Sequence, residues 1–145
     1  MLSHPNSIGI LDNRYILLKE LGSGLSCITY KIIDYNSNKE CVTKIFFEKY
    51  KYLFESEVEF NKEINKNENP SFTKYITSSV GEIIISNTTE NKPYIIFELC
   101  SKGQLLKYIN CTEEILNEKY IKIIFIKILQ AIHSLKWEFI IEILN

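Results

Sequence analysis

The chain has 145 residues, of which 46% are apolar and 24% are charged, and its formal net charge is -1. This length allows one hydrophobic core and excludes two complete domains. The composition is that of a globular protein, and the near-neutral charge gives no electrostatic basis for binding nucleic acid or an anionic membrane.

The N-terminal segment and the cysteines both predict an intracellular chain, in the cytoplasm or nucleus. Residues 1–7 contain neither a cationic stretch nor an apolar run, so no secretory signal is expected. The most apolar stretch, residues 121–129, is far shorter than the roughly 20 residues of a membrane span. The four cysteines form no Cys-x-x-Cys pair, which favours buried thiols over disulfides or a zinc site. These cysteines are Cys27, Cys41, Cys100 and Cys111.

The hydrophobic pattern predicts five strands and three helices in chain order. Runs of β-branched and aromatic residues predict strands over residues 15–21, 28–33, 41–47, 80–85 and 94–99. A helical period predicts helices over residues 52–64, 104–109 and about 112–135. A polar loop is expected at residues 86–92. The strands come first and the helices last, so we expect an α+β protein with a segregated helical part.

Two glycines, Gly22 and Gly24, lie between the first two predicted strands. Glycines are common in hairpin turns that require positive φ, and this explanation suffices for the motif taken alone. A second explanation is that the missing side chains let backbone N–H groups approach a triphosphate.

A lysine on the third predicted strand and a glutamate on the following helix form a candidate pair. Strand alternation puts Val42, Lys44 and Phe46 on one face. An isolated lysine at this position could simply extend its ammonium into water at the sheet edge. Among the glutamates of the following helix, only Glu57 lies on the apolar stripe that must turn toward the sheet, which consists of Leu53, Phe60 and Ile64. The remaining glutamates suit a solvated helix face: Glu55, Glu59 and Glu63.

The order of glycine loop, strand lysine, helix glutamate and apolar strand resembles the eukaryotic protein kinase superfamily, of the serine/threonine type. That family has Gly-x-Gly-x-x-Gly-x-Val at a strand turn and Val-Ala-x-Lys on the third strand. Gly22 and Gly24 match the pattern, whereas Cys27 replaces the third glycine and Thr29 replaces the valine. Val42 stands where the alanine belongs and leaves less room for a nucleotide base.

The resemblance implies an ATP site and a role for each matching residue. Lys44 would bind the α and β phosphates and pair with Glu57, and these two are the predicted catalytic residues. Phe97 would be the gatekeeper, ahead of a hinge from Glu98 to Cys100 whose backbone pairs with the adenine edge. The predicted ATP-binding residues are Gly22, Gly24, Thr29, Val42, Lys44, Phe97, Glu98 and Cys100.

The resemblance also divides the chain into parts. Residues 1–14 would be an N-terminal extension, and residues 15–99 an N-lobe with a five-stranded antiparallel sheet and one helix. Residues 100–136 would form the hinge and the first helices of an incomplete C-lobe, leaving residues 137–145 as a tail.

Two kinase motifs do not occur in the sequence. Phosphate transfer requires His-Arg-Asp to position the hydroxyl and Asp-Phe-Gly to hold magnesium, and neither is present. One permitted codon choice from Trp137 onward, read from its third base, encodes Gly-Ile-Tyr-His-Arg-Asp-Ile-Lys. We therefore hypothesise that residues 137–145 are out of frame; the alternative is an unrelated apolar tail.

The expected function is that of the ATP-binding part of a serine/threonine protein kinase, which would transfer the ATP γ-phosphate to protein hydroxyls. ATP is the expected ligand, Mg²⁺ is expected for the family although its ligands are absent from this sequence, and this chain alone is expected to be inactive. A protein substrate would bind only with a complete C-lobe. The alternative is a non-catalytic, pseudokinase-like binding module that acts through its N-lobe or an uncovered helix, and self-association through residues 116–135 is expected.

Overall fold

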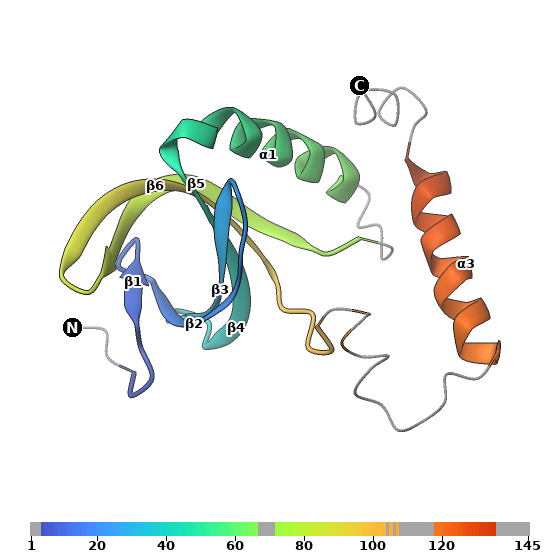
Figure 1. Cartoon of the computed structure of the whole chain (residues 1–145), viewed down its shortest axis with the longest axis horizontal. Helices are drawn as coiled ribbons and strands as arrows, with labels where there is room; N and C mark the ends of the chain where they lie inside the picture. The colour runs from blue at the N-terminus through green and yellow to red at the C-terminus, as the bar shows by residue number, and fades with distance from the viewer. Residues whose placement is uncertain (1–3, 67–71, 104, 106, 108–117, 136–145) are drawn as a thin grey trace.

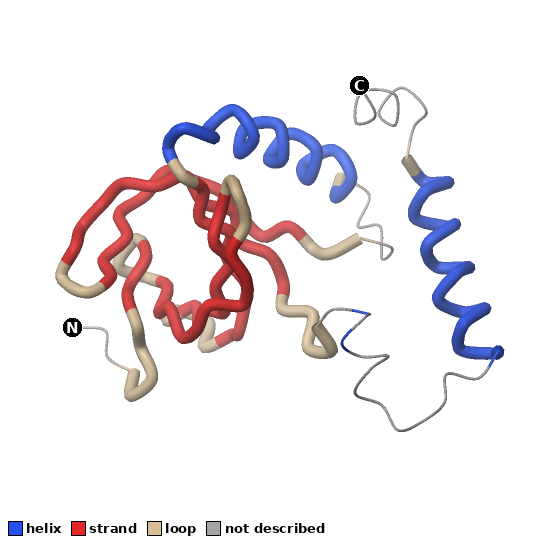
Figure 2. The backbone as a smooth tube through the Cα atoms, in the orientation of Figure 1, coloured by secondary structure: helices blue, strands red, loops and turns tan. Residues whose placement is uncertain are grey.

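The computed structural model describes residues 4–66, 72–103, 105, 107 and 118–135 (Figures 1 and 2). Among these residues the strands and helices follow the predicted order, with one additional strand near the N-terminus. In chain order the elements are β1 (Gly9–Leu11), β2 (Tyr15–Ser23), β3 (Cys27–Asp34), β4 (Lys39–Phe46), the 3₁₀ turn η1 (Glu48–Tyr50), α1 (Lys51–Asn65), β5 (Tyr75–Ile85), β6 (Thr88–Glu98) and α3 (Glu118–Ser134).

The strands form a closed antiparallel barrel in the order β1-β2-β3-β4-β6-β5 (Figure 1). The prediction of a five-stranded sheet is therefore wrong, because the barrel has a sixth strand. This strand, β1, lies within the segment that was predicted to be an N-terminal extension. It closes the barrel by pairing with both β2 and β5, with Gly9 opposite Ile85. A Cβ at Gly9 would lie 2.5 Å from the Ile84 carbonyl oxygen, so glycine permits this close approach. Three residues are too few to show the alternation of a strand, which explains why the sequence did not predict β1.

The hairpin between β5 and β6 is tighter than expected. Ser86 and Asn87 both have positive φ, 50° and 65°, which is the backbone of a two-residue hairpin turn. The predicted loop over residues 86–92 is therefore wrong, because β6 already begins at Thr88. Its first residues are polar, and a polar run with no apolar alternation does not predict a strand.

The core has two parts. The barrel interior holds inward-facing side chains from every strand, among them Leu11, Leu17, Ile32 and Ile96, all fully buried. A second cluster joins the outer face of the sheet to α1: Phe46, Phe54, Ile95 and Phe97.

The buried stripe of α1 differs from the predicted one by one position. Phe54 is buried, whereas Leu53, which we expected to face the sheet, is 38% exposed. Phe54 packs edge to face on Phe46, with ring centroids 5.6 Å apart. This aromatic contact sets the rotation of the helix about its axis.

A hydrogen-bonded carboxylate stabilises the β3–β4 turn. Asp34 is buried and accepts two hydrogen bonds from the guanidinium of Arg14, both of 2.9 Å. It also accepts one from the Ser37 hydroxyl and one from the Asn36 backbone N–H. The hydrogen bonds from Arg14 are the main cause that lowers the pKa of Asp34 from 3.8 to about 2.

This shift predicts a loss of stability in acid. Because the pKa is lower in the folded state, the contribution of Asp34 is complete above about pH 4 and is lost as the pH falls toward 2. The shift corresponds to about 2.5 kcal/mol at roughly 1.4 kcal/mol per pKa unit, and solvent around the half-exposed Arg14 reduces the expected loss to about 1–2 kcal/mol. Urea unfolding at pH 5 and pH 2.5 measures this loss of stability. Asp34→Asn should be less stable than wild type at pH 5 and should show a smaller drop between the two pH values; an equal drop in both proteins would contradict the assignment.

The helix α3 carries an apolar surface of its own. None of its residues is buried, although the expected central C-lobe helix is covered on most sides. Its exposed large side chains are Tyr120, Ile121, Ile123, Phe125, Ile126, Ile128, Leu129 and Ile132. The predicted start of this helix near residue 112, most of the segment 104–109 and the tail 137–145 lie outside the described residues. Within the described part of the chain, no helix combines the length and the apolar character needed to span a membrane.

Candidate functional site

A cavity of about 500 Å³ lies where β4 and β6 meet α1 and the segment that follows β6. Its polar lining comes from Lys44, Glu57, Asn61, Thr73, Glu98 and Cys100. Its apolar lining comes from Leu21, Val42, Phe60, Ile64, Phe72, Phe97 and Leu99. The cavity thus combines apolar walls with a few charged and hydrogen-bonding groups, as small-molecule sites do.

Lys44 and Glu57 meet in this cavity. The Nζ of Lys44 lies 2.5 Å from Oε1 of Glu57, and both side chains are about one-third exposed. The structure therefore confirms the predicted contact and the choice of Glu57 among the four glutamates of that region. The same ammonium lies 5.8 Å from the centroid of the Phe97 ring. The positive charge of the ammonium is therefore next to a carboxylate on one side and an aromatic ring on another.

The elements that carry the pair explain its geometry. Lys44 and Val42 alternate with the inward-facing residues of β4 and so point out of the barrel toward α1. Glu57 lies three residues after Phe54 and four before Asn61, the two buried residues of α1. Residues at these spacings share one helix face, so the packing of Phe54 and Asn61 turns Glu57 toward the sheet.

The cavity brings together most, but not all, of the predicted ATP-binding residues. Val42, Phe97, Glu98 and Cys100 line it together with Lys44. Three predicted residues are absent from the lining: Gly22, Gly24 and Thr29. Thr29 is nevertheless the cross-strand partner of both Gly22 and Lys44, so the hairpin that carries the glycines is hydrogen-bonded to the strand that carries the lysine.

The fold does not explain the two glycines. Gly22 belongs to β2, and neither Gly22 nor Gly24 has positive φ. A Cβ at Gly22 would have no heavy atom within 4 Å, and one at Gly24 would make only an ordinary contact at 3.8 Å with the Cys27 carbonyl oxygen. The turn explanation for these glycines is therefore wrong, because any residue could adopt this backbone without a clash.

Several residues that line the cavity were not predicted as site residues, among them Asn61, Phe72 and Thr73. Asn61 is buried, and its Nδ2 donates a 2.8 Å hydrogen bond to the Glu57 carbonyl oxygen. Its position four residues after Glu57 was a usable signal, because such residues share a helix face. Phe72 and Thr73 precede β5 in a segment without any periodicity, and only the tertiary structure shows that they line the cavity.

The predicted hinge leaves the sheet at Glu98. The Glu98 N–H donates to the Lys74 carbonyl oxygen at 3.0 Å, and the Lys74 N–H donates to the Glu98 carboxylate at 2.8 Å. These two hydrogen bonds tie the end of β6 to the segment before β5. A turn follows, in which the N–H of Gly103, at φ 67°, donates to the Cys100 carbonyl oxygen.

No group of three or more His, Cys, Asp or Glu side chains gathers at a metal-binding distance within the described part of the chain. Three cysteines in this part are free thiols: Cys27, Cys41 and Cys100.

Comparisons with known proteins agree with a kinase-like architecture. No family model matches the chain. The sequence is 32% identical over 130 residues to a probable serine/threonine-protein kinase, fhkA, of Dictyostelium discoideum, an alignment that covers 83% of this chain and 20% of that protein. The fold is similar to a crystal structure of a kinase domain, with a TM-score of 0.51 and 18% identity over 67% of this chain and 27% of that one.

Both comparisons concern only part of the similar protein. The chain spans about a fifth of the length of the curated relative and about a quarter of the solved chain. The structural likeness shows a protein-kinase-like fold.

Proposed function

We propose that this chain is the ATP-binding part of a serine/threonine protein kinase, with the nucleotide in the cavity between the barrel and α1. The observation that carries the proposal is the contact of Lys44 with Glu57 at 2.5 Å inside that cavity. An ammonium has three N–H donors, so a lysine held by one carboxylate can still donate to phosphate oxygens. Glu57 would fix the direction of the ammonium, and Lys44 would bind the phosphates.

The cavity walls fit the remaining parts of a nucleotide. A volume of about 500 Å³ is within the usual range of roughly 300–1,000 Å³ for small-molecule sites. Val42 and Phe97 are directly opposite each other on neighbouring strands and would form an apolar wall for the base. The backbone from Glu98 to Cys100 follows that wall directly, at the position where the proposal puts the adenine edge.

The two unexplained glycines support the same proposal. The fold has no need of glycine at positions 22 and 24 and so supplies no reason for glycine there. A triphosphate below the β2–β3 hairpin would supply one, because glycines let backbone N–H groups approach phosphate oxygens closely. In this proposal Gly22, Gly24 and Thr29 complete the site when a nucleotide is bound.

Phosphate transfer is proposed to need more than these 145 residues. The sequence contains neither His-Arg-Asp nor Asp-Phe-Gly, and the catalytic assignment of Lys44 and Glu57 holds only together with such groups. The proposed division keeps residues 15–99 as the N-lobe, now with β1 joined to it, and the hinge and first C-lobe helices after it. A protein substrate belongs to the complete kinase.

Isothermal titration of the chain with ATP tests the site. We expect Lys44→Met to weaken ATP binding at least ten-fold, because the ammonium that meets the phosphates is lost. Lys31→Met is the matched control, since Lys31 is also a partly buried strand lysine paired with a glutamate, Glu40, at 2.5 Å, but does not line the cavity. It should bind ATP as the wild type does.

Two outcomes would contradict the proposal. Equal ATP affinity of the wild type and Lys44→Met would show that Lys44 does not bind the nucleotide. Incorporation of phosphate from ATP and Mg²⁺ into a protein acceptor, above the level of Lys44→Met, would refute the statement that the chain alone does not transfer phosphate.

A second candidate function is a non-catalytic binding module. The exposed apolar side chains of α3 favour it, because large exposed apolar surfaces mark interaction sites. A chain that binds no ATP but forms a defined complex through α3 would support this candidate over the first.

A further inference from the structure

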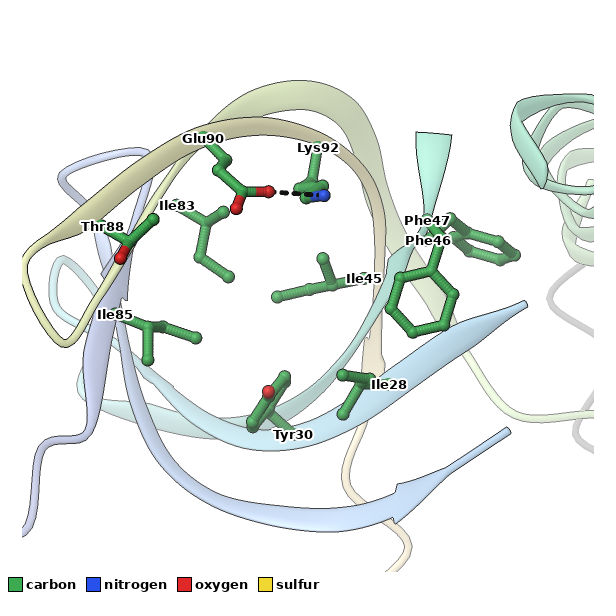
Figure 3. A pocket seen from close by; sticks show the side chains of 10 residues that line it. All are labelled: Ile28, Tyr30, Ile45, Phe46, Phe47, Ile83, Ile85, Thr88, Glu90 and Lys92. Atoms are coloured by element: carbon green, nitrogen blue, oxygen red, sulfur yellow. Dashed lines mark ion pairs between the residues drawn. The ribbon is translucent and has the colours of Figure 1, made fainter. Parts of the chain in front are cut away.

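A second cavity, of about 240 Å³, lies inside one end of the barrel (Figure 3). Figure 3 shows isoleucines from three strands pointing into it: Ile28 from β3, Ile45 from β4, and Ile83 and Ile85 from β5. No residue of α1 lines it, and it shares no lining residue with the proposed nucleotide site. We call this space the lumen.

The lumen is open because of the residues on β6. Small barrels normally fill their interior with side chains. The inward-facing positions at the start of β6 instead carry Thr88, Glu90 and Lys92. Glu90 and Lys92 pair with each other at 2.5 Å at the rim, as Figure 3 shows, rather than filling the space. The result is an apolar hollow with a polar rim on one side.

The same stretch of β6 has a free edge. β6 pairs with β4 only from Tyr94 to Glu98, whereas its pairing with β5 continues back to Thr88. Among the described strands, none pairs with the other edge of residues 88–92. Alternate backbone N–H and C=O groups on a free edge are available to another extended chain. Pro93 has no N–H and marks the limit of this edge.

We propose that this end of the barrel binds an extended peptide segment of a partner protein, which pairs with the free edge of β6 and places one large apolar side chain in the lumen. A free strand edge recognises an extended backbone, and side chains on such a strand alternate, so one of them would point into the barrel. This inference does not depend on nucleotide binding.

The chemistry of the rim and the size of the lumen both favour a peptide. Glu90 accepts hydrogen bonds and Lys92 donates them, so together they complement a neutral amide, which does both. An apolar cavity of about 150 Å³ already holds a benzene molecule, so 240 Å³ suits a single aromatic or aliphatic side chain. It is smaller than the usual small-molecule site of roughly 300–1,000 Å³.

Selection from a displayed library of random nine-residue peptides on the full chain tests the proposal. The enriched peptides should share one large apolar residue and lack proline beside it. The best peptide, made in capped form, should lose at least ten-fold in affinity when that residue is changed to alanine. N-methylation of the neighbouring amides should cause a similar loss, because it removes the hydrogen bonds to the edge of β6.

Matched protein variants locate the site. Ile85→Phe fills the lumen and should abolish binding, whereas Ile84→Phe, the same change on the outward face of β5, should leave it unchanged. Lys92→Met removes the hydrogen-bond donor at the rim while keeping a side chain of similar size, and it should weaken binding about ten-fold. This variant keeps the test decisive if Ile85→Phe does not fold. The proposal is overturned by a library without enriched peptides, by equal binding to Ile85→Phe and Ile84→Phe, or by N-methylated peptides or toluene that bind as tightly as the selected peptide.

Discussion

Replacing Phe46 with alanine is expected to lower the free energy of unfolding by about 3–5 kcal/mol, the usual cost of removing a buried phenylalanine. Phe46 is 1% exposed and packs against Phe54 of α1 in the cluster that joins the sheet to the helix. The loss includes both the transfer of the ring and the cavity left behind. It is a large part of the roughly 5–15 kcal/mol that holds an ordinary domain together.

The same substitution should also weaken the proposed nucleotide site. Phe54 sits on Phe46, and Glu57 follows Phe54 by less than one helical turn. Loosening the aromatic contact lets α1 move and separates Glu57 from Lys44. We therefore expect ATP affinity to fall in Phe46→Ala even under conditions in which most of the protein is folded.

Urea unfolding and ATP titration of two alanine variants decide this prediction. Tyr52→Ala is the control, because Tyr52 is an aromatic residue of the same helix that is 60% exposed. It should cost less than about 1 kcal/mol, as surface substitutions do. A loss below 1 kcal/mol for Phe46→Ala would show that this cluster does not hold α1 on the sheet.

The purified 145-residue chain is expected to self-associate through α3. Eight large apolar side chains of this helix are exposed, including Phe125 at 63% and Leu129 at 59%. Burying one such side chain contributes about 1.5–3 kcal/mol, so covering several of them can drive a stable association. Sedimentation velocity over a range of concentrations should show species larger than the monomer.

Charged substitutions on α3 distinguish this association from aggregation elsewhere. Phe125 and Leu129 are four residues apart and share one helix face, so the double variant Phe125→Glu, Leu129→Glu should sediment as a monomer. The variant Lys127→Glu, Gln130→Glu makes the helix more negative still, without removing a large apolar side chain, and it should still associate. A wild-type chain that remains monomeric at every concentration would contradict the prediction.

Local pattern was enough to predict much of the site. Strand alternation put Lys44 on one face with Val42 and Phe46, and helical spacing selected Glu57 from four glutamates, so the pair could be predicted before any contact was known. The relevant signals are short in range, because each depends on neighbours within one strand or one helix. The roles of Val42, Phe97, Glu98 and Cys100 were predicted from the resemblance to protein kinases rather than from local pattern, and the tertiary structure brings these residues to one cavity.

The tertiary structure decided what depends on contacts between distant residues. Barrel closure rests on the pairing of Gly9 with Ile85, which no local period encodes. The rotation of α1 is set by the contact of Phe54 with Phe46 rather than by the apolar Leu53. The free edge of β6 likewise exists only because β6 extends beyond β4, and the length of one strand relative to another is a property of register, which a single sequence does not specify.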